Sequence, residues 1–234
     1  MQRPVRVAAA GAALAVVALV WAAAAAYRLR CWSTGALDLR WDAFARRDAG
    51  VAGRHLSALL GVLGGPGVPA VAVAVGLLWL VHRRLGRRWA VAAGATIVVS
   101  GLQVLAMKLV AARAAPGQVG GWHESFPSGH VANAAVTAVL VSALLLRGRW
   151  RVLPLLWPVL MAWSRTVEHA HWLSDVIAGV AVGTADGVLG LVVAGALLGA
   201  GARIRRDVAT LLVEEPLEGA RTAADPWTAG RSGV

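Results

Sequence analysis

Charged residues and cysteine are scarce in this sequence. Only 15% of the 234 residues are charged, and 12 of these are acidic. A chain with so few charges is neither a disordered segment nor a basic nucleic-acid-binding module, and its composition is equally unlike that of a soluble enzyme domain. The single cysteine, Cys31, has no second cysteine with which to pair, which excludes a disulfide-stabilised scaffold.

Apolar residues fill most of the chain. The set AVILMFWYC accounts for 58% of the residues, 27 further residues are glycine, and mean hydropathy is +0.65. The net charge of +11 comes from arginine, because Lys108 is the only lysine among the 23 basic residues. In so apolar a chain, surplus arginine indicates orientation in a bilayer. We therefore expect a membrane protein with several spans and no nucleic-acid partner.

Six apolar runs are candidates for membrane-spanning helices. A bilayer core takes about 20 residues of helix, and backbone groups in lipid must be hydrogen-bonded within their own segment. The sequence therefore predicts an all-α, six-transmembrane-helix bundle, in which we favour a retained first span over a cleaved signal peptide. Pro154 and Pro158 are expected to kink the fifth run. The runs cover residues 5–26, 67–81, 89–110, 131–146, 152–163 and 172–199.

Arginines in the short linkers set the predicted orientation. They cluster before the first run, between runs two and three, between runs four and five, and after run six. With six spans all of these clusters lie on one side, which by the positive-inside rule is the cytoplasm, together with both termini. The predicted organisation is a first transmembrane helix at 1–27, an outer segment at 28–60, a transmembrane core with the candidate site at 61–200, and a polar, disordered tail at 201–234.

The first outer segment contains an amphipathic pattern over residues 36–47. Leu37, Trp41 and Phe44 recur at helical spacing, and charged residues occupy the other face. This pattern predicts either an interfacial helix that lies on the outer leaflet or a solvated loop helix without a role in lipid binding.

Polar residues that can do chemistry are concentrated in the other two outer segments. His171 and Asp175 are four residues apart at the start of the sixth run, and so they share one helix face. An aspartate that accepts from one imidazole nitrogen leaves the other nitrogen free to attack. A buried polar pair that only holds the helix end is the alternative.

The segment before the fourth run is suited to binding an anion. Ser128 and Gly129 stand at a helix start, where backbone N–H groups and the helix dipole favour negative charge. His130 follows and is a candidate proton donor to a leaving oxygen. Lys108 and Arg165 add positive charge, unless they only snorkel to the interface. Together these groups describe a pocket for a phosphate.

Three ordered strings carry a resemblance to a known family. They look like the motifs of the type 2 phosphatidic acid phosphatase superfamily, in its bacterial integral-membrane branch, and the resemblance covers about residues 55–200. The strings are Lys108 with Pro116, Pro127-Ser128-Gly129-His130, and Ser164-Arg165 with His171 and Asp175.

The resemblance implies a role for each matching residue. His171 would be the nucleophile that forms a phosphohistidine, with Asp175 orienting it, and His130 would protonate the leaving group. The phosphoryl oxygens would be held by Lys108, Arg165, Ser128 and the Gly129 amide. The resemblance further implies that neither a metal nor another cofactor is needed, because cationic side chains balance the developing charge.

One position departs from the family pattern. Ala115 stands where the family has an arginine directly before the proline, and the nearest arginine is Arg113. Either Arg113 reaches the phosphate from a rearranged loop, or one cation is missing. The second case would leave a weakly active or non-catalytic lipid-phosphate binding or transport protein on the same scaffold.

The resemblance implies a lipid phosphatase in a bacterial inner membrane, with its active site facing outward. Its substrate would be a membrane lipid phosphate or diphosphate, such as polyprenyl diphosphate, phosphatidic acid or phosphatidylglycerol phosphate, and the motifs predict neither the tail nor the oligomeric state. A metal site is a less favoured alternative, because Lys108 and Arg165 would repel a cation. Its ligands would come from His123, Glu124, His130, His169, His171 and Asp175.

Overall fold

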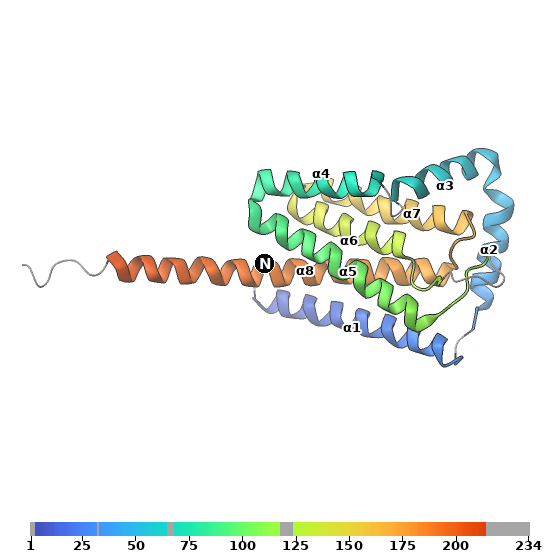
Figure 1. The fold of residues 1–234 in the computed structure, drawn as a ribbon, viewed down its shortest axis with the longest axis horizontal. Coiled ribbons are helices and arrows are strands. Elements are labelled where there is room, and N and C mark those ends of the chain that lie inside the picture. Colours follow the sequence, from blue (N-terminus) through green and yellow to red (C-terminus); the bar gives the residue numbers. More distant parts are fainter. Residues whose placement is uncertain (1–2, 32, 65–67, 118–123, 214–234) are drawn as a thin grey trace, which may run out of the picture. The chain divides into compact units, whose positions relative to one another are not determined.

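The computed structural model describes residues 3–31, 33–64, 68–117 and 124–213, and these ranges contain helices and no strands. The predicted all-α class is therefore confirmed (Figure 1). The chain divides into two compact units, Met1–Ala194 and Gly195–Val234, and the candidate site lies in the first. The elements are α1 (Arg3–Arg28), α2 (Ala36–Asp48), α3 (Gly50–Gly64), α4 (Val68–Leu85), α5 (Arg87–Ala111), α6 (Gly129–Leu144), the 3-10 helix η1 (Gly148–Leu155), α7 (Leu156–Val167) and α8 (Leu173–Val213).

Each of the six predicted runs is matched by a helix of the structure. The segments Pro4–Arg28, Arg87–Ala111 and Leu173–Gly199 are long and apolar enough to cross a membrane, and Gly129–Leu144 is a shorter apolar helix. Helices α4 and α7 correspond to the second and fifth runs. Many large apolar side chains on these helices are exposed, among them Val98, Leu102 and Leu109 along α5. These helices identify the chain as a membrane protein.

The fifth run differs from the prediction at its beginning. Residues 148–155 form the 3-10 helix η1, which contains Pro154, and the α-helix starts only at Leu156. Proline has no N–H to donate, so Pro154 cannot join an α-helical ladder from inside it. Pro158 is tolerated because it lies in the first turn of α7, where the N–H groups have no helical acceptor.

The helices of the first unit pack side by side around α6 and the neighbouring part of α8. Helix α5 contacts α1, α4 and α6, while α7 contacts α3 and α6 (Figure 1). One buried apolar cluster joins Tyr27 of α1, Met107 of α5, Phe126 of the loop before α6, and Val182 of α8. This cluster holds the ends of three helices against the loop that leads into the candidate site.

Small residues let α6 and α8 approach closely. A Cβ atom on Gly183 would lie 2.2 Å from the carbonyl oxygen of Ala132, and one on Gly179 would lie 2.7 Å from the carbonyl oxygen of Ser128. Only glycine fits at such separations, as is usual where helices in membranes pack backbone to backbone. The close packing brings the first turns of α6 and α8 together.

The first outer segment holds two helices instead of one. The predicted helix over 36–47 is present as α2, and residues 50–64 form a further helix, α3, that the sequence analysis did not predict. The aspartates of α2 face inward, with Asp38 and Asp42 buried, while Leu37 is 73% exposed and Phe44 50% exposed. The apolar side of α2 is therefore free to face lipid or solvent, and the two expectations for this helix stay open.

The end of α8 lies beyond the predicted boundary at residue 200. The helix continues to Val213, so residues 201–213 are helical where a disordered tail was predicted. The run over 201–213 lacks proline and glycine after Gly201, which leaves nothing to stop the helix. Residues 214–234 lie outside the described part of the chain.

Candidate active site

The first turn of α6 presents a serine hydroxyl that the helix does not use. Ser128 is the N-cap residue and has extended backbone angles, yet its side chain makes no capping hydrogen bond. Its backbone N–H instead donates to the carbonyl oxygen of Asp175 at 3.0 Å, which ties the start of α6 to the start of α8. The hydroxyl of Ser128 is buried and has no hydrogen-bond partner among the described residues. It is thus available to a ligand.

The first turn of α8 presents a carboxylate, and the segment just before the helix presents an imidazole. Asp175 is fully buried, and its Oδ2 accepts the backbone N–H of Trp172 at 2.8 Å. The Nδ1 atom of His171 lies 3.7 Å from the same oxygen, a separation that a small ring rotation would convert into a hydrogen bond. His171 and Asp175 thus face each other, although His171 lies two residues before α8 and not on the shared helix face that their spacing predicts.

Burial keeps the imidazole of His171 neutral. Removal from water lowers the pKa of His171 below its ordinary value of 6.5, and the positive charge of Lys108 acts in the same direction, while Asp175 opposes both. A neutral imidazole has a free lone pair on one nitrogen, which is the form required of a nucleophile.

Two cations approach this pair from other helices. The Nζ atom of Lys108, near the end of α5, donates to the carbonyl oxygen of Glu124 and lies beside Gly129. On α7, Arg165 donates from Nη2 to the Ser164 hydroxyl at 2.9 Å. His130 interacts electrostatically with the charges of Lys108 and Arg165 and with the imidazole of His171. The structure therefore brings together Lys108, Ser128, Gly129, His130, Arg165, His171 and Asp175.

Two buried donors in this group lack acceptors. Among the residues that the structure describes, neither the Ser128 hydroxyl nor the Nε atom of Arg165 has a hydrogen-bond partner. A buried polar group without a partner destabilises the fold by about 1–3 kcal/mol. Because both groups are donors, an anion with several oxygens would satisfy them together. The geometry thus suits a tetrahedral oxyanion.

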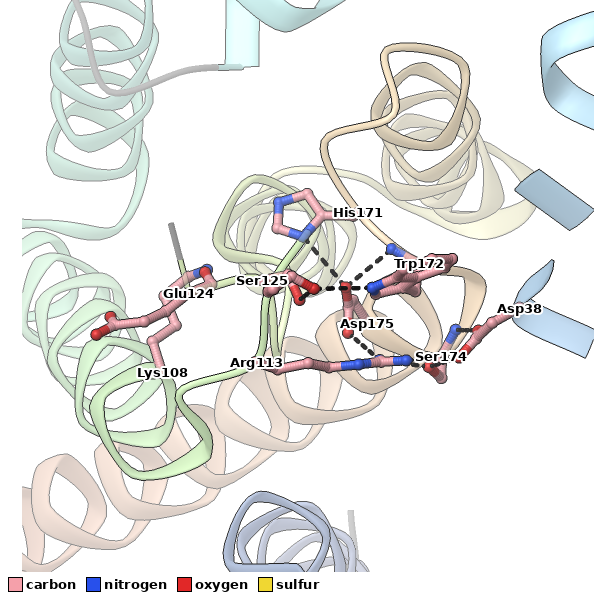
Figure 2. A network of polar contacts seen from close by, with 10 residues as sticks. Asp38, Lys108, Arg113, Glu124, Ser125, His171, Trp172, Ser174 and Asp175 are labelled. Carbon is pink, nitrogen blue, oxygen red and sulfur yellow. Dashed lines mark hydrogen bonds and ion pairs between the residues drawn. The ribbon is translucent and has the colours of Figure 1, made fainter. Parts of the chain in front are cut away.

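Arg113 is placed differently from the other predicted phosphate ligands. Its Nη1 lies 2.5 Å from Asp175 Oδ1, and its Nη2 lies 2.6 Å from Asp38 Oδ2 (Figure 2). Both terminal nitrogens are therefore engaged by carboxylates, and only 7% of the residue is exposed. Ala115, the position of the family arginine, is buried as well. The cations that remain near His130 are Lys108 and Arg165, which the structure does not pair with carboxylates in the described ranges.

Sequence reasoning missed the contribution of α2 to this network. Asp38 contacts both Arg113 and Ser174, which is 136 residues away along the chain. The available signal was the spacing of Asp38 and Asp42, which are four residues apart and so share the charged face of the predicted helix. Both expectations for this helix leave its charged face in solvent, because nothing in the local sequence shows what covers that face.

The residues of the alternative metal site do not come together as a ligand set within the described residues. Within residues 3–31, 33–64, 68–117 and 124–213, no three His, Cys, Asp or Glu side chains are grouped so that they can hold a metal ion. His169, one of the proposed ligands, instead has its Nδ1 2.7 Å from Asp42 of α2. His123, another, lies outside the described residues.

A small cavity lies beside His130. Its volume is about 160 Å³, and its walls come from helices α3 to α7. Asn133 and Thr137 follow His130 along the same wall of α6, while the remaining lining is mainly apolar. The cavity is lined by Leu63, Gly64, Val73, Ala74, Ile97, His130, Asn133, Ala134, Thr137 and Trp157.

Comparisons with known proteins agree with the three motifs. Residues 89–201 match the model of the PAP2 superfamily, and no curated protein matches the chain significantly. The fold is similar to the crystal structure of a transmembrane PAP2-type phosphatidylglycerolphosphate phosphatase from Bacillus subtilis, with 20% sequence identity and a TM-score of 0.60 over 75% of this chain and 92% of that chain. The resemblance drawn from the motifs is thereby confirmed, since all three motifs lie within residues 89–201, which match the PAP2 superfamily model.

Proposed function

We propose that this protein is an integral-membrane lipid phosphatase that works through a phosphohistidine intermediate at the extracytoplasmic face. The observation that carries the proposal is the convergence of a neutral buried imidazole, His171, with two cations and two buried donors that lack acceptors. Simple binding of a phosphate needs the cations and donors, but it does not need a nucleophile with an orienting carboxylate.

The first half of the reaction transfers the phosphoryl group to His171. The Nε2 lone pair of His171 attacks phosphorus, and the bond from phosphorus to the lipid oxygen breaks. The electron pair of that bond goes to the leaving oxygen, which takes a proton from His130. Lys108, Arg165, the Ser128 hydroxyl and the Gly129 amide stabilise the negative charge on the three equatorial oxygens.

The second half releases phosphate. His130, which has lost its proton, accepts one from a water molecule, and the oxygen of that water attacks the phosphorus of the phosphohistidine. The phosphorus–nitrogen bond breaks, its electron pair returns to His171, and inorganic phosphate leaves. These steps use no metal, because Lys108 and Arg165 provide the positive charge.

A lipid substrate fits the surroundings of His130. The leaving oxygen carries the lipid tail, so the tail must start next to the proton donor. The mainly apolar cavity beside His130 is suited to the first carbons of such a tail. The similar Bacillus subtilis structure is named a phosphatidylglycerolphosphate phosphatase, which makes that lipid one candidate beside phosphatidic acid and polyprenyl diphosphate.

Purified protein should release inorganic phosphate from at least one lipid phosphate in the presence of a strong chelator. The screen uses phosphatidic acid, phosphatidylglycerol phosphate and a polyprenyl diphosphate in mixed micelles, with colorimetric detection of phosphate. Loss of activity with chelator, restored by added zinc, would contradict the metal-free mechanism. Binding of a lipid phosphate without release of phosphate would favour the alternative of a non-catalytic binding or transport protein, which Ala115 motivates.

Gly61→Ala is expected to impair phosphate binding without unfolding the bundle. A Cβ atom at residue 61 would lie 1.9 Å from Nη2 of Arg165, the flexible end of that side chain, so the guanidinium must move away. A charge-assisted hydrogen bond contributes about 1.5–3 kcal/mol, so kcat/KM should fall about 10–100-fold. Gly101→Ala is the matched control, because a Cβ atom there meets nothing within 4 Å. Equal kinetics for the two variants would argue against a phosphate contact by Arg165.

A further inference from the structure

The N-terminus of α8 is held by two carboxylates from different parts of the chain. Asp175 belongs to the helix itself, whereas Asp38 reaches it from α2. Oδ1 of Asp38 accepts the backbone N–H of Ser174 at 2.8 Å, and Oδ2 accepts the Ser174 hydroxyl at 2.8 Å. Asp38 therefore caps the helix that presents Asp175, at the end where the helix dipole favours negative charge.

Arg113 links the two carboxylates. Its Nη1 pairs with Asp175 and its Nη2 with Asp38, so that the guanidinium lies between them (Figure 2). Its carbon Cζ lies 4.4 Å from the ring centre of Tyr27 and 5.6 Å from that of Trp172. Aromatic rings and two ion pairs leave this side chain little freedom to move.

Asp38 is ionised in this network. Burial by itself raises the pKa of a carboxyl group, but the hydrogen bonds from Ser174 and the ion pair with Arg113 outweigh it and lower the pKa of Asp38 below its ordinary value. Asp38 thus carries a full negative charge at neutral pH, and its attraction holds Arg113 where Arg113 can meet Asp175.

The two oxygens of Asp175 have separate partners. Oδ1 meets Arg113, while Oδ2 accepts the N–H of Trp172 and faces His171 at 3.7 Å. A carboxylate is planar, so a side chain that fixes Oδ1 also fixes the direction of Oδ2. The orientation of Asp175 towards His171 therefore depends on Arg113 together with the Trp172 N–H, and the position of Arg113 depends on Asp38.

We propose that Asp38 is a positioning residue, which acts through Arg113 and Ser174 to keep one oxygen of Asp175 directed at His171. The proposal rests on the proposed phosphatase function. It gives Arg113 a role other than phosphate binding, and it makes α2, outside the superfamily match at 89–201, part of the catalytic machinery.

Steady-state kinetics of Asp38→Asn provide the first test. The amide has the shape of the carboxylate without its charge, and we expect kcat to fall about 10–100-fold with KM changed less than about twofold, as for other residues that orient a reacting group. Asp38→Glu, which keeps the charge, should restore part of kcat. The double variant Asp38→Asn with Arg113→Gln should be no worse than the poorer single variant, because both changes break one chain of contacts.

Asp42→Asn is the matched control. Asp42 lies one turn further along α2 and is also buried, but its Oδ1 meets the Nδ1 atom of His169 at 2.7 Å, away from the contacts of Arg113 with Asp38 and Asp175. The Asp42→Asn variant therefore measures how weaker attachment of α2 by itself changes kcat. If Asp42→Asn lowers kcat as much as Asp38→Asn, the effect belongs to the docking of α2 and the positioning role is overturned.

A second readout does not depend on turnover. The titration of His171 can be followed by NMR of the full-length protein in micelles with 15N-labelled histidine, and its signal assigned by its loss in His171→Gln. Asp175 raises the pKa of His171, so a misdirected Asp175 should move the midpoint to lower pH in Asp38→Asn but not in Asp42→Asn. Lys108 and His130, which also act on His171, are present in both variants.

The two readouts separate the possible failures. Wild-type protein that releases no phosphate would overturn the proposed function, while the titration would still test the positioning role. A midpoint and a kcat that are the same in Asp38→Asn as in wild type would overturn the positioning role alone. A raised KM in Arg113→Gln, with kcat unchanged in both Arg113→Gln and Asp38→Asn, would assign Arg113 to phosphate binding instead.

Discussion

His171→Gln should abolish phosphate release, with a fall in kcat of about 10⁴-fold or more. The amide of glutamine has nearly the polarity of the imidazole but no lone pair able to attack phosphorus, so the phosphohistidine cannot form. The measurement is release of phosphate from the best lipid substrate of the screen, together with trapping of labelled enzyme from a lipid labelled in the phosphoryl group. Wild-type protein should yield an acid-labile, alkali-stable phosphoenzyme, and His171→Gln should yield none.

The fold of the variant can be checked separately from its activity. Loss of the His171 imidazole leaves the ion pair of Arg113 with Asp175 and the hydrogen bond from Trp172 in place, so thermal stability in detergent should change little. Full labelling of the His171→Gln protein would show that another side chain is the nucleophile. Release of phosphate at more than about one hundredth of the wild-type rate would point to direct attack by water.

His130→Ala should lower kcat about 10²–10⁴-fold, the usual contribution of a general acid and base. Protonation of the leaving oxygen and activation of water both depend on this imidazole in the proposed mechanism. The two roles can be separated with an aryl phosphate, whose acidic phenol leaves without a proton. With that substrate the first step of the variant should be nearly normal, and the phosphohistidine should accumulate because its hydrolysis is slow.

Burst kinetics distinguish this outcome from a binding defect. His130→Ala should show a burst of phenol release equal to about one per active site, followed by slow turnover. Equal impairment of the lipid and aryl substrates, with no accumulated phosphoenzyme, would contradict the role of His130 in leaving-group protonation. In that case His130 would serve only to shape the cavity that it borders.

The structure agreed with the sequence wherever the signal was local. The helix predicted over 36–47 is α2 (Ala36–Asp48), and the long apolar runs at 5–26 and 89–110 lie within α1 and α5. His171 and Asp175 also face each other, as two residues four apart can, although His171 lies just before α8 and not within it. Such features depend on neighbours a few positions apart, which the sequence displays directly.

The predictions failed where a distant segment decides the outcome. Asp38 belongs to the charged face of the predicted amphipathic helix, yet this side chain packs inward, and Arg113, one of the expected phosphate ligands, pairs with two carboxylates that the local sequence does not indicate. Helix α3 was not predicted, because four glycines interrupt its residues 50–64. In each case a contact across 60 residues or more, such as that of Arg113 with Asp175, outweighs the local pattern.

The apolar runs and the motifs are enough to predict the helical membrane class of the protein and to propose its reactive groups. Apolar runs of membrane length require helices, since lipid offers the backbone no hydrogen bonds, and the three motifs name the cations, the imidazoles and the acid. The pairing of the charges, in contrast, follows from the tertiary structure and is not visible in the sequence. Ion pairing depends on separations of a few ångströms, and these arise when α2, the loop after α5 and the first turn of α8 pack together around Arg113.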